Sequence, residues 1–183
     1  MTEIERQPLL DGAAVEQTLA RLAGELVARY GGTEQLVLMG IHRRGVQLAE
    51  RLAAEIERAS GAAVPTGTLD ITLYRDDLMA IGPRPVVGPT RLPPGGIDDR
   101  VVVIVDDVLY TGRTVRAALD ELADFGRPRR ILLCVLVDRG ERELPIQADL
   151  VGLQADAGAH GRVEVRVPEL DGGWGVDLVR GAE

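Results

Sequence analysis

The sequence predicts an α/β fold in which a mostly parallel, twisted sheet is flanked by helices. Three short segments are apolar throughout, as expected of strands buried on both faces: 36–39, 101–105 and 131–137. Three longer segments carry apolar residues at the spacing of amphipathic helices: 11–30, 46–56 and 115–125. Strands and helices that alternate along a chain are typical of a parallel sheet covered by helices.

The composition is that of one globular domain spanning residues 1–183. Hydrophobic residues make up 45% and charged residues 27% of the chain, which is long enough to bury a sizeable core. No stretch approaches the ~18 apolar residues that span a membrane, and residues 1–8 lack the apolar core of a signal peptide. We therefore expect a cytoplasmic protein that does not associate with a membrane. The net charge of −8 provides little long-range attraction to nucleic acid.

The loop after the first strand has the composition of an anion site. Gly40 ends this strand, and Ile41-His42-Arg43-Arg44-Gly45 leads into the second helix. Glycine exposes main-chain N–H groups and arginine adds paired donors, which together suit a pyrophosphate group. The alternative interpretation is that Arg43 and Arg44 are ordinary solvated charges. We give His42 no catalytic role.

A tract rich in glycine and proline follows the next predicted strand. Segment 66–74 alternates well enough to predict that strand. Residues 78–100 then contain nine glycines and prolines, which excludes a regular element. Long irregular tracts in compact domains are uncommon, and they often form active-site lids. A simple surface excursion is the alternative.

The stretch 101–114 is the main candidate for a functional site. Its apolar strand, 101–105, ends in Asp106 and Asp107. Both carboxylates therefore fall at the carboxyl end of a buried strand, where open α/β sheets bind their ligands. Adjacent carboxylates are good acceptors for a pair of sugar hydroxyls and good ligands for Mg²⁺.

The loop that follows the acidic pair suits a phosphate monoester. Thr111, Gly112 and Thr114 lead into the helix 115–125, whose amino terminus offers unpaired N–H groups and a positive dipole end. Together with the carboxylates, this loop predicts a site for a phosphorylated ribose. The alternative is an ordinary buried strand followed by a capped helix.

Further strands are predicted towards the carboxyl terminus: 149–152, 163–167 and an edge strand at 174–179. Cys134 is the single cysteine and lies inside the apolar segment 131–137. We therefore expect Cys134 to be a small buried side chain that neither acts as a nucleophile nor forms a disulfide.

The stretch 101–114 resembles the phosphoribosyl pyrophosphate (PRPP) signature of the type I phosphoribosyltransferases. Three strings also resemble the PyrR family, bacterial uracil phosphoribosyltransferases that act as pyrimidine-operon attenuators: 70–78, 105–114 and 135–146. The resemblance runs from about residue 10 to Gly152 and fades beyond it. It implies a type I phosphoribosyltransferase fold with a flexible lid over about 74–100 and a small hood over about 138–170.

The resemblance also implies a role for each part of the site. Asp106, Asp107 and Arg75 would act in catalysis. The residues implied to bind PRPP are His42, Arg43, Arg44, Gly45, Asp106, Asp107, Val108, Leu109, Tyr110, Thr111, Gly112, Arg113 and Thr114. Those implied to contact the base are Asp138, Arg139 and Val151. Mg²⁺ would be held by Asp106 and Asp107, directly or through water, with Asp156 as a further acidic contact.

The implied reaction is the transfer of the phosphoribosyl group from PRPP to uracil, which yields UMP and pyrophosphate. Two alternatives stand beside it: an RNA-binding attenuator with weak catalysis, and a purine-base phosphoribosyltransferase. The resemblance also implies a homodimer or a higher homo-oligomer.

RNA binding is the second implied activity. Arg21, Arg29 and Arg142 would contact the leader mRNA of a pyrimidine operon in the presence of UMP or UTP. Four positions depart from the basic or histidine residues expected at such a face: Gly24, Glu141, Gln147 and Leu153. Neutral and acidic replacements weaken contacts to phosphate.

Overall fold

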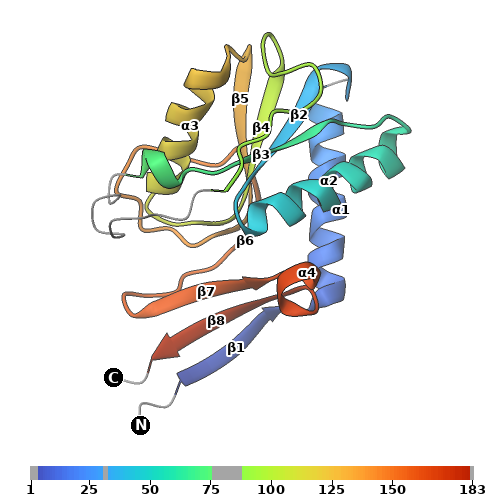
Figure 1. Ribbon diagram of the computed structural model, residues 1–183. Coiled ribbons are helices and arrows are strands. Elements are labelled where there is room, and N and C mark those ends of the chain that lie inside the picture. Colours follow the sequence, from blue (N-terminus) through green and yellow to red (C-terminus); the bar gives the residue numbers. More distant parts are fainter. Residues whose placement is uncertain (1–3, 31–32, 76–87, 182–183) are drawn as a thin grey trace.

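The protein is represented by a computed structural model that describes residues 4–30, 33–75 and 88–181. A five-stranded parallel sheet in the order β3-β2-β4-β5-β6 forms the main body, and a three-stranded antiparallel sheet in the order β1-β8-β7 lies below it in Figure 1. The predicted α/β class with a mostly parallel sheet is confirmed.

The strands are β1 (Ile4–Leu10), β2 (Leu36–Ile41), β3 (Thr66–Leu69), β4 (Val101–Leu109), β5 (Arg130–Asp138), β6 (Leu150–Gln154), β7 (Gly161–Arg166) and β8 (Gly175–Gly181). The α-helices are α1 (Gly12–Tyr30), α2 (Arg44–Ser60), α3 (Arg113–Phe125) and α4 (Pro168–Asp171), and short 3₁₀ helices cover Thr33–Gln35 and Thr72–Tyr74.

Helices cover both faces of the parallel sheet. Val101 and Val103 of β4 pack in a cluster with α1 and α2, whereas Val102 and Ile104 pack in a second cluster with α3. Figure 1 shows α3 on one side of the sheet and α1 and α2 on the other. Because successive strand residues point to opposite faces, burial on both sides explains why β4 is apolar at every position up to Asp106.

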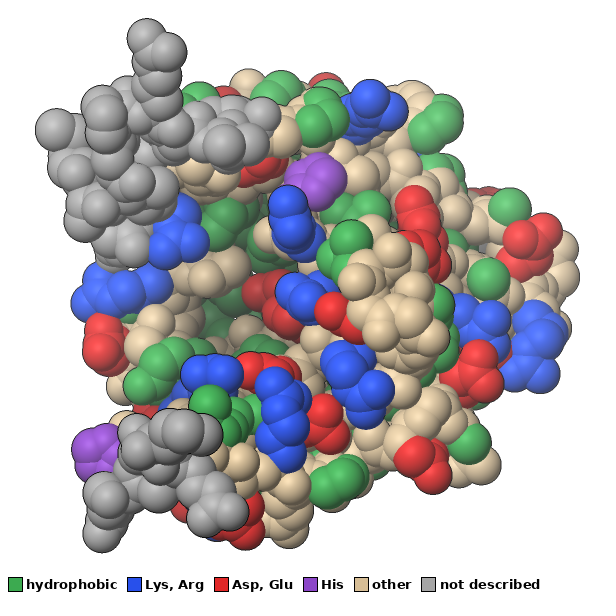
Figure 2. All heavy atoms as spheres, turned by 60° about the horizontal axis from the view of Figure 1, so that its bottom comes forward, with side chains coloured by type: hydrophobic (Ala, Val, Ile, Leu, Met, Phe, Trp, Pro, Cys, Tyr) green, Lys and Arg blue, Asp and Glu red, His purple; other side chains and the backbone are tan. Residues whose placement is uncertain are grey.

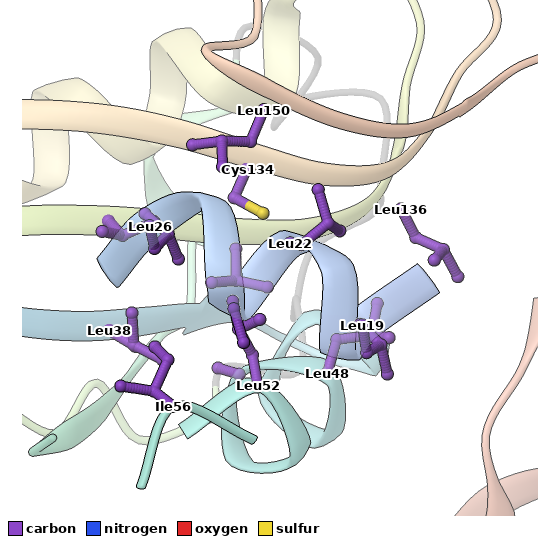
Figure 3. Packing of buried hydrophobic residues seen from close by; sticks show 14 of the residues in the cluster. Leu19, Leu22, Leu26, Leu38, Leu48, Leu52, Ile56, Cys134, Leu136 and Leu150 are labelled. Carbon is purple, nitrogen blue, oxygen red and sulfur yellow. The ribbon is translucent and has the colours of Figure 1, made fainter. Parts of the chain in front are cut away.

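The helices α1 and α2 pack against each other and against the sheet. Figure 3 shows Leu22 and Leu26 of α1 beside Leu52 of α2, with Cys134 of β5 on the sheet side. Cys134 is buried, and this burial raises the pKa of its thiol to about 12. The thiol therefore stays protonated at neutral pH, as expected of a packing residue rather than a nucleophile.

The structure shortens the predicted strand at 66–74. β3 ends at Leu69, and a 3₁₀ turn covers Thr72–Tyr74. The carboxylate of Asp70 accepts hydrogen bonds from the main-chain N–H of Thr72, at 2.9 Å, and from its hydroxyl. Aspartate side chains that bond to the main chain two residues on stabilise turns in this way, so the chain leaves the sheet here.

The amino-terminal strand was not predicted from the sequence. β1 is mostly exposed and carries Pro8 where its pairing with β8 shifts register. Proline is tolerated in an edge strand because an edge position needs no further donor. With β1 in place, the strand predicted at the sheet edge, 174–179, corresponds to β8 and is the central strand of the small sheet.

The small sheet draws on more of the chain than the predicted hood at 138–170, since β1 and β8 lie outside that range. Of the predicted lid, residues 76–87 lie outside the described part of the chain. Its returning end pairs with β3 through hydrogen bonds of 2.8 and 2.9 Å between Thr68 and Arg91. Within the described ranges, no helix is long and apolar enough to cross a membrane.

Candidate active site

A cleft of about 660 Å³ opens at the carboxyl ends of β2 and β4. The predicted PRPP residues that line it are His42, Arg43, Arg44, Asp106, Asp107, Val108 and Thr114. Segments more than sixty residues apart meet here because β2 and β4 are adjacent parallel strands and open their loops at the same edge. The structure therefore brings the acidic pair, the loop residues 42–44 and Thr114 to one place, whereas the predicted PRPP residues Gly45 and 109–113 do not line this cleft.

The two adjacent carboxylates differ in environment. Asp106 is 6% exposed, whereas Asp107 is partly exposed. The N–H of Asp107 donates to Asp106 Oδ1 at 2.9 Å, and the N–H of Val108 donates to Asp107 Oδ1 at 2.8 Å. Burial, and then the negative charge of Asp107, raise the pKa of Asp106 well above its usual value. A pair of this kind is stabilised by a cation or by hydroxyl donors at the carboxylates.

The acidic pair fits a magnesium ion that is shared with a phosphorylated ligand. In the part of the chain that the structure describes, no group of three or more Asp, Glu, His or Cys side chains could hold a metal. Magnesium commonly binds through one or two carboxylates, keeps several waters and takes further oxygens from phosphate groups. Asp106 and Asp107 supply such oxygen donors at the cleft.

The loop between β2 and α2 lies close to β4, and glycine makes this approach feasible. A Cβ on Gly45 would lie 2.5 Å from the carbonyl oxygen of Val105, and one on Gly40 would lie 2.5 Å from that of Gly45. The His42–Arg43 peptide bond is cis. α2 begins at Arg44, and its second residue, Gly45, lies against Val105 and Asp106 of β4. This arrangement suits anion binding next to the carboxylates.

The predicted phosphate loop is held by the segment that follows β5. The carbonyl oxygen of Thr111 accepts hydrogen bonds from the N–H groups of Glu143, at 3.0 Å, and Leu144, at 3.1 Å. Gly112 has a φ of 94°, and a Cβ there would lie 3.3 Å from the side chain of Ile146. Glycine is therefore required by both conformation and space. The loop before α3 is therefore held by main-chain hydrogen bonds and by packing against residues 143–146.

The side of the cleft nearest the predicted lid contains Asp70 and Arg75. Burial acts to raise the pKa of Asp70, but the hydrogen bonds from Thr72 and from the N–H of Gly88 outweigh it, so this pKa is lowered. The carboxylate thereby ties the turn that precedes the lid segment to Gly88 within it. Arg75, which is exposed, follows this turn and lines the cleft.

The returning end of the lid segment is also anchored to α3. The N–H of Asp70 donates to Thr90 Oγ1 at 3.0 Å, and the Thr90 hydroxyl donates to Glu121 of α3. Glu121 is 2% exposed, and burial raises its pKa. On the outgoing side, the hydroxyl of Tyr74 donates to Asp124 at 2.7 Å. The chain before residue 76 and the chain after residue 87 are thus both fixed to α3, through Tyr74 and Thr90.

A second hollow contains two of the three predicted base-binding residues. It is lined by Asp138, Arg139 and Gln154, together with Asp156. Arg139 is buried, and its guanidinium lies 3.8 Å from the ring centre of Tyr110, which links this hollow to the phosphate loop. Val151 does not line it: this residue lies earlier on β6 and packs against the cluster around α3.

The same hollow holds Asp156, away from the acidic pair. Asp156 Oδ1 accepts the N–H of Gly158 at 2.8 Å, and its neighbours in the hollow include Asp138 rather than Asp106 or Asp107. Its role as a metal contact stays a prediction that the structure does not support by proximity.

A third hollow of about 540 Å³ lies between the two sheets and shares Arg44 and Asp107 with the cleft. The small sheet contributes charged side chains to it, including Arg6 and Glu164. These two form an ion pair of 2.7 Å, and Arg6 also lies 3.6 Å from the buried carboxylate of Asp177. The small sheet therefore presents a charged face to the cleft.

Comparison with known proteins gives the family. A model of the phosphoribosyl transferase domain matches residues 6–167. A Bifunctional protein PyrR from Pelotomaculum thermopropionicum is 51% identical, covering 98% of each chain, and one from Herpetosiphon aurantiacus is 55% identical, covering 89% of this chain and 90% of its own. The chain belongs to the PyrR family of phosphoribosyltransferases. The similarity continues beyond Gly152, where we had expected it to fade.

Solved structures confirm the type I phosphoribosyltransferase fold. The hypoxanthine phosphoribosyltransferase of Trypanosoma cruzi superposes with a TM-score of 0.71 at 16% identity, covering 96% of this chain and 97% of its own. A hypoxanthine phosphoribosyltransferase from Staphylococcus aureus gives a TM-score of 0.65 at 20% identity, covering 85% and 80%. At these identities the likeness concerns the fold alone.

The arginines that we expected to bind RNA have partners within this PyrR-family chain. Arg21 donates to the carbonyl oxygens of Val151 and Gly152, at 3.2 and 2.8 Å, and Arg29 donates to that of Asp149 at 3.1 Å. They lie along β6, the edge strand of the large sheet, so their guanidinium groups satisfy carbonyl groups at that edge.

Arg142 is more fully engaged. Nε donates to the carbonyl oxygen of Ile146, Nη1 to those of Tyr110 and Gly140, and Nη2 to Asp138, at distances between 2.6 and 3.2 Å. Its RNA role stays a prediction, since a phosphate would compete with these bonds. On the face shown in Figure 2, blue and red side chains are interleaved rather than gathered in one basic patch.

Several residues that line the hollows were not found from the sequence. Asp70 and Thr72 line the cleft, and Gln154 lines the second hollow. Asp70 and Gln154 stand at the carboxyl ends of β3 and β6, so strand ends as such were the signal that would have found them. Arg6 and Glu164 belong to strands of the small sheet, and their position in sequence gives no comparable signal.

Proposed function

We propose that the protein transfers the phosphoribosyl group of PRPP to uracil, forming UMP and releasing pyrophosphate. The observation that carries this proposal is one cleft lined by an adjacent carboxylate pair, by the loop residues 42–44 at the start of α2 and by Thr114 at the start of α3. That order of donors matches a sugar with a phosphate at one end and a pyrophosphate at the other. Membership of the PyrR family supports it further.

In the proposed mode of binding, the 5-phosphate occupies the loop formed by residues 110–114. The pyrophosphate lies against residues 42–45, where Arg44 and main-chain N–H groups can donate to it. Asp106 and Asp107 would accept hydrogen bonds from the ribose hydroxyls and would hold magnesium, directly or through water. When bound, magnesium neutralises charge on the leaving pyrophosphate. Arg75 at the lid segment then closes over the pyrophosphate and helps to exclude water.

The transfer needs no covalent nucleophile. The uracil nitrogen forms a bond to C1 of the ribose while the bond between C1 and the pyrophosphate oxygen breaks, and the proton of the nitrogen passes to the departing pyrophosphate or to water. Positive charge develops on the sugar in the transition state. Asp106 and Asp107 lie at the sugar and stabilise this charge electrostatically. Asp138 and Arg139, with the second hollow, provide the surroundings of the base.

The test is pyrophosphate release from magnesium PRPP with uracil, hypoxanthine, guanine and orotate offered separately. We expect release with uracil and none above background with the purines or orotate. Release with a purine alone would replace the proposal by a purine-base transferase. If no base caused pyrophosphate release, although the folded protein still bound PRPP, regulation would remain as the main function.

We also propose that the protein binds the leader mRNA of a pyrimidine operon when a uridine nucleotide, UMP or UTP, occupies the cleft. The matched relatives are named bifunctional, and Arg21 and Arg29 lie together on α1. Glu25 forms ion pairs with both arginines, at 2.6 and 3.3 Å. Because this carboxylate offsets part of their charge, we expect RNA affinity to depend only modestly on salt. Homo-oligomer formation, which is part of the same proposal, would repeat this helix face in the assembly.

The RNA proposal makes a quantitative prediction about salt. Two phosphate contacts to single-stranded RNA correspond to a loss of affinity of about sevenfold between 50 and 200 mM salt. The double variant Arg21→Gln, Arg29→Gln should flatten this dependence and weaken binding in a gel-shift titration with UMP present. Equal binding to leader and to unrelated RNA would rule the proposal out.

A further inference from the structure

An ion pair connects the small sheet to the proposed pyrophosphate loop. Arg44, the first residue of α2, extends to Asp171, the last residue of α4 between β7 and β8. Arg44 Nη2 lies 2.9 Å from Asp171 Oδ1, and Nε lies 3.3 Å from Oδ2. Two parallel bonds of this kind fix both the position and the plane of the guanidinium. The partners are 127 residues apart in the chain.

Asp171 is itself held in place by its own turn. Its Oδ2 accepts the N–H of Val167 at 2.8 Å, and its own N–H donates to the carbonyl oxygen of Val167 at 2.8 Å. The hydrogen bond from Arg44, followed by that from Val167, lowers the pKa of Asp171. The carboxylate is therefore ionised at neutral pH and has a fixed orientation towards α2.

The pairing leaves part of the Arg44 side chain available to a ligand. Arg44 lines both the catalytic cleft and the hollow between the sheets, and Asp171 lines only the latter of the two. Asp171 engages Nε and Nη2, while Nη1 has no hydrogen-bond partner among the described residues. A long arginine side chain loses rotamer freedom when it binds an anion. A partner that fixes it beforehand removes that loss from the binding step.

We propose that Asp171 is a positioning residue of the small sheet that holds Arg44 oriented for the pyrophosphate group of PRPP. The inference rests on the proposed function for the identity of the ligand, and it adds a residue that touches no substrate. The small sheet thereby takes part in the pyrophosphate end of the site through α4.

The test compares Asp171→Asn with Glu169→Gln. Asparagine has nearly the same shape and its oxygen still accepts the N–H of Val167, so the substitution removes mainly the charge and the second bond to Arg44. Glu169 is an exposed carboxylate on the same short helix, which makes its substitution a matched control for charge. Thermal unfolding of both variants checks that the small sheet remains folded.

The readouts are binding of magnesium pyrophosphate by calorimetry and steady-state kinetics with PRPP and uracil. We expect Asp171→Asn to weaken pyrophosphate binding and to raise KM for PRPP by about tenfold, while kcat changes less than about twofold. The reason is that Arg44 would bind the pyrophosphate group in the ground state and in the transition state alike, so both lose the same interaction. Glu169→Gln should match the unchanged protein. In an Arg44→Gln background, Asp171→Asn should have no further effect, since the two residues act as one unit.

The outcomes separate this inference from the proposed function. Weaker pyrophosphate binding that depends on Arg44, in a protein that does not use uracil, supports the positioning role and contradicts the uracil reaction. Uracil transfer with Asp171→Asn equal to Glu169→Gln overturns the positioning role alone. Tighter pyrophosphate binding in Asp171→Asn also overturns it, because Asp171 would then compete with the ligand for Arg44.

Discussion

Replacing Asp107 by asparagine is expected to slow UMP formation by about 10²–10³-fold, the loss seen when one group that stabilises transition-state charge is removed. Asp107 lies at the point where the cleft and the hollow between the sheets meet. We propose that its carboxylate, next to Asp106, faces the sugar. Asparagine keeps the shape and one oxygen but removes this charge. Initial rates at saturating magnesium PRPP and uracil measure the effect.

The control for this substitution is Asp120→Asn. Asp120 is an exposed carboxylate of α3 that pairs with Arg116 at 3.2 Å and does not line the cleft. An exposed pair of this kind contributes little to stability, so the control should keep full activity. If folded Asp107→Asn protein formed UMP at the same rate as the control, Asp107 would have no part in the mechanism.

Substituting Gly45 by alanine is expected to affect both stability and activity. The added Cβ would lie 2.5 Å from the carbonyl oxygen of Val105 and 3.4 Å from Asp106 Cα. Both are main-chain atoms of β4, the central strand of the five-stranded sheet, so neither can move aside easily. Overpacking of this kind costs about 1–3 kcal/mol. Any relaxation also moves the first turn of α2 away from the acidic pair, so transfer should fall with stability.

Gly24→Ala is the matched control. Gly24 lies within α1, and a Cβ there has no atom within 4 Å. Alanine is favoured over glycine in a helix by about 1 kcal/mol, so this variant should be more stable. Urea unfolding of both variants measures the expected loss of stability in Gly45→Ala and the expected gain in Gly24→Ala. If Gly45→Ala were as stable and active as Gly24→Ala, the close packing of α2 on β4 would not be a requirement of the site.

The large sheet could be predicted because its physical signals are local. β4 is apolar without interruption up to Asp106, since helices cover both of its faces, and α3 follows with a clear helical period. The switch from apolar residues to Asp106 and Asp107 marked the ligand edge of the sheet, although β4 continues past the predicted end at Val105 and pairs with β5 as far as Leu109. That the loops after the segments 36–39 and 101–105 open at the same edge then followed from the rules of parallel sheets, whereas the strand order came from the structure.

The small sheet could not be predicted in the same way. β1 contains Pro8, is mostly exposed and does not alternate polar with apolar residues, and its partner β8 lies more than 160 residues away in sequence. Without β1, β8 was placed at an edge. Asp171 and Glu164 gave no signal either, because each belongs to a charged pair whose second member comes from a different part of the chain.

A structure of the protein with magnesium PRPP tests the central claim most directly, because it locates all three parts of the ligand at once. The account predicts the 5-phosphate at the N–H groups of residues 111–114, the ribose hydroxyls at Asp106 and Asp107, and the pyrophosphate at residues 42–45 beside Arg44. PRPP bound in another hollow, or with its phosphate and pyrophosphate ends exchanged between the two loops, would contradict the account.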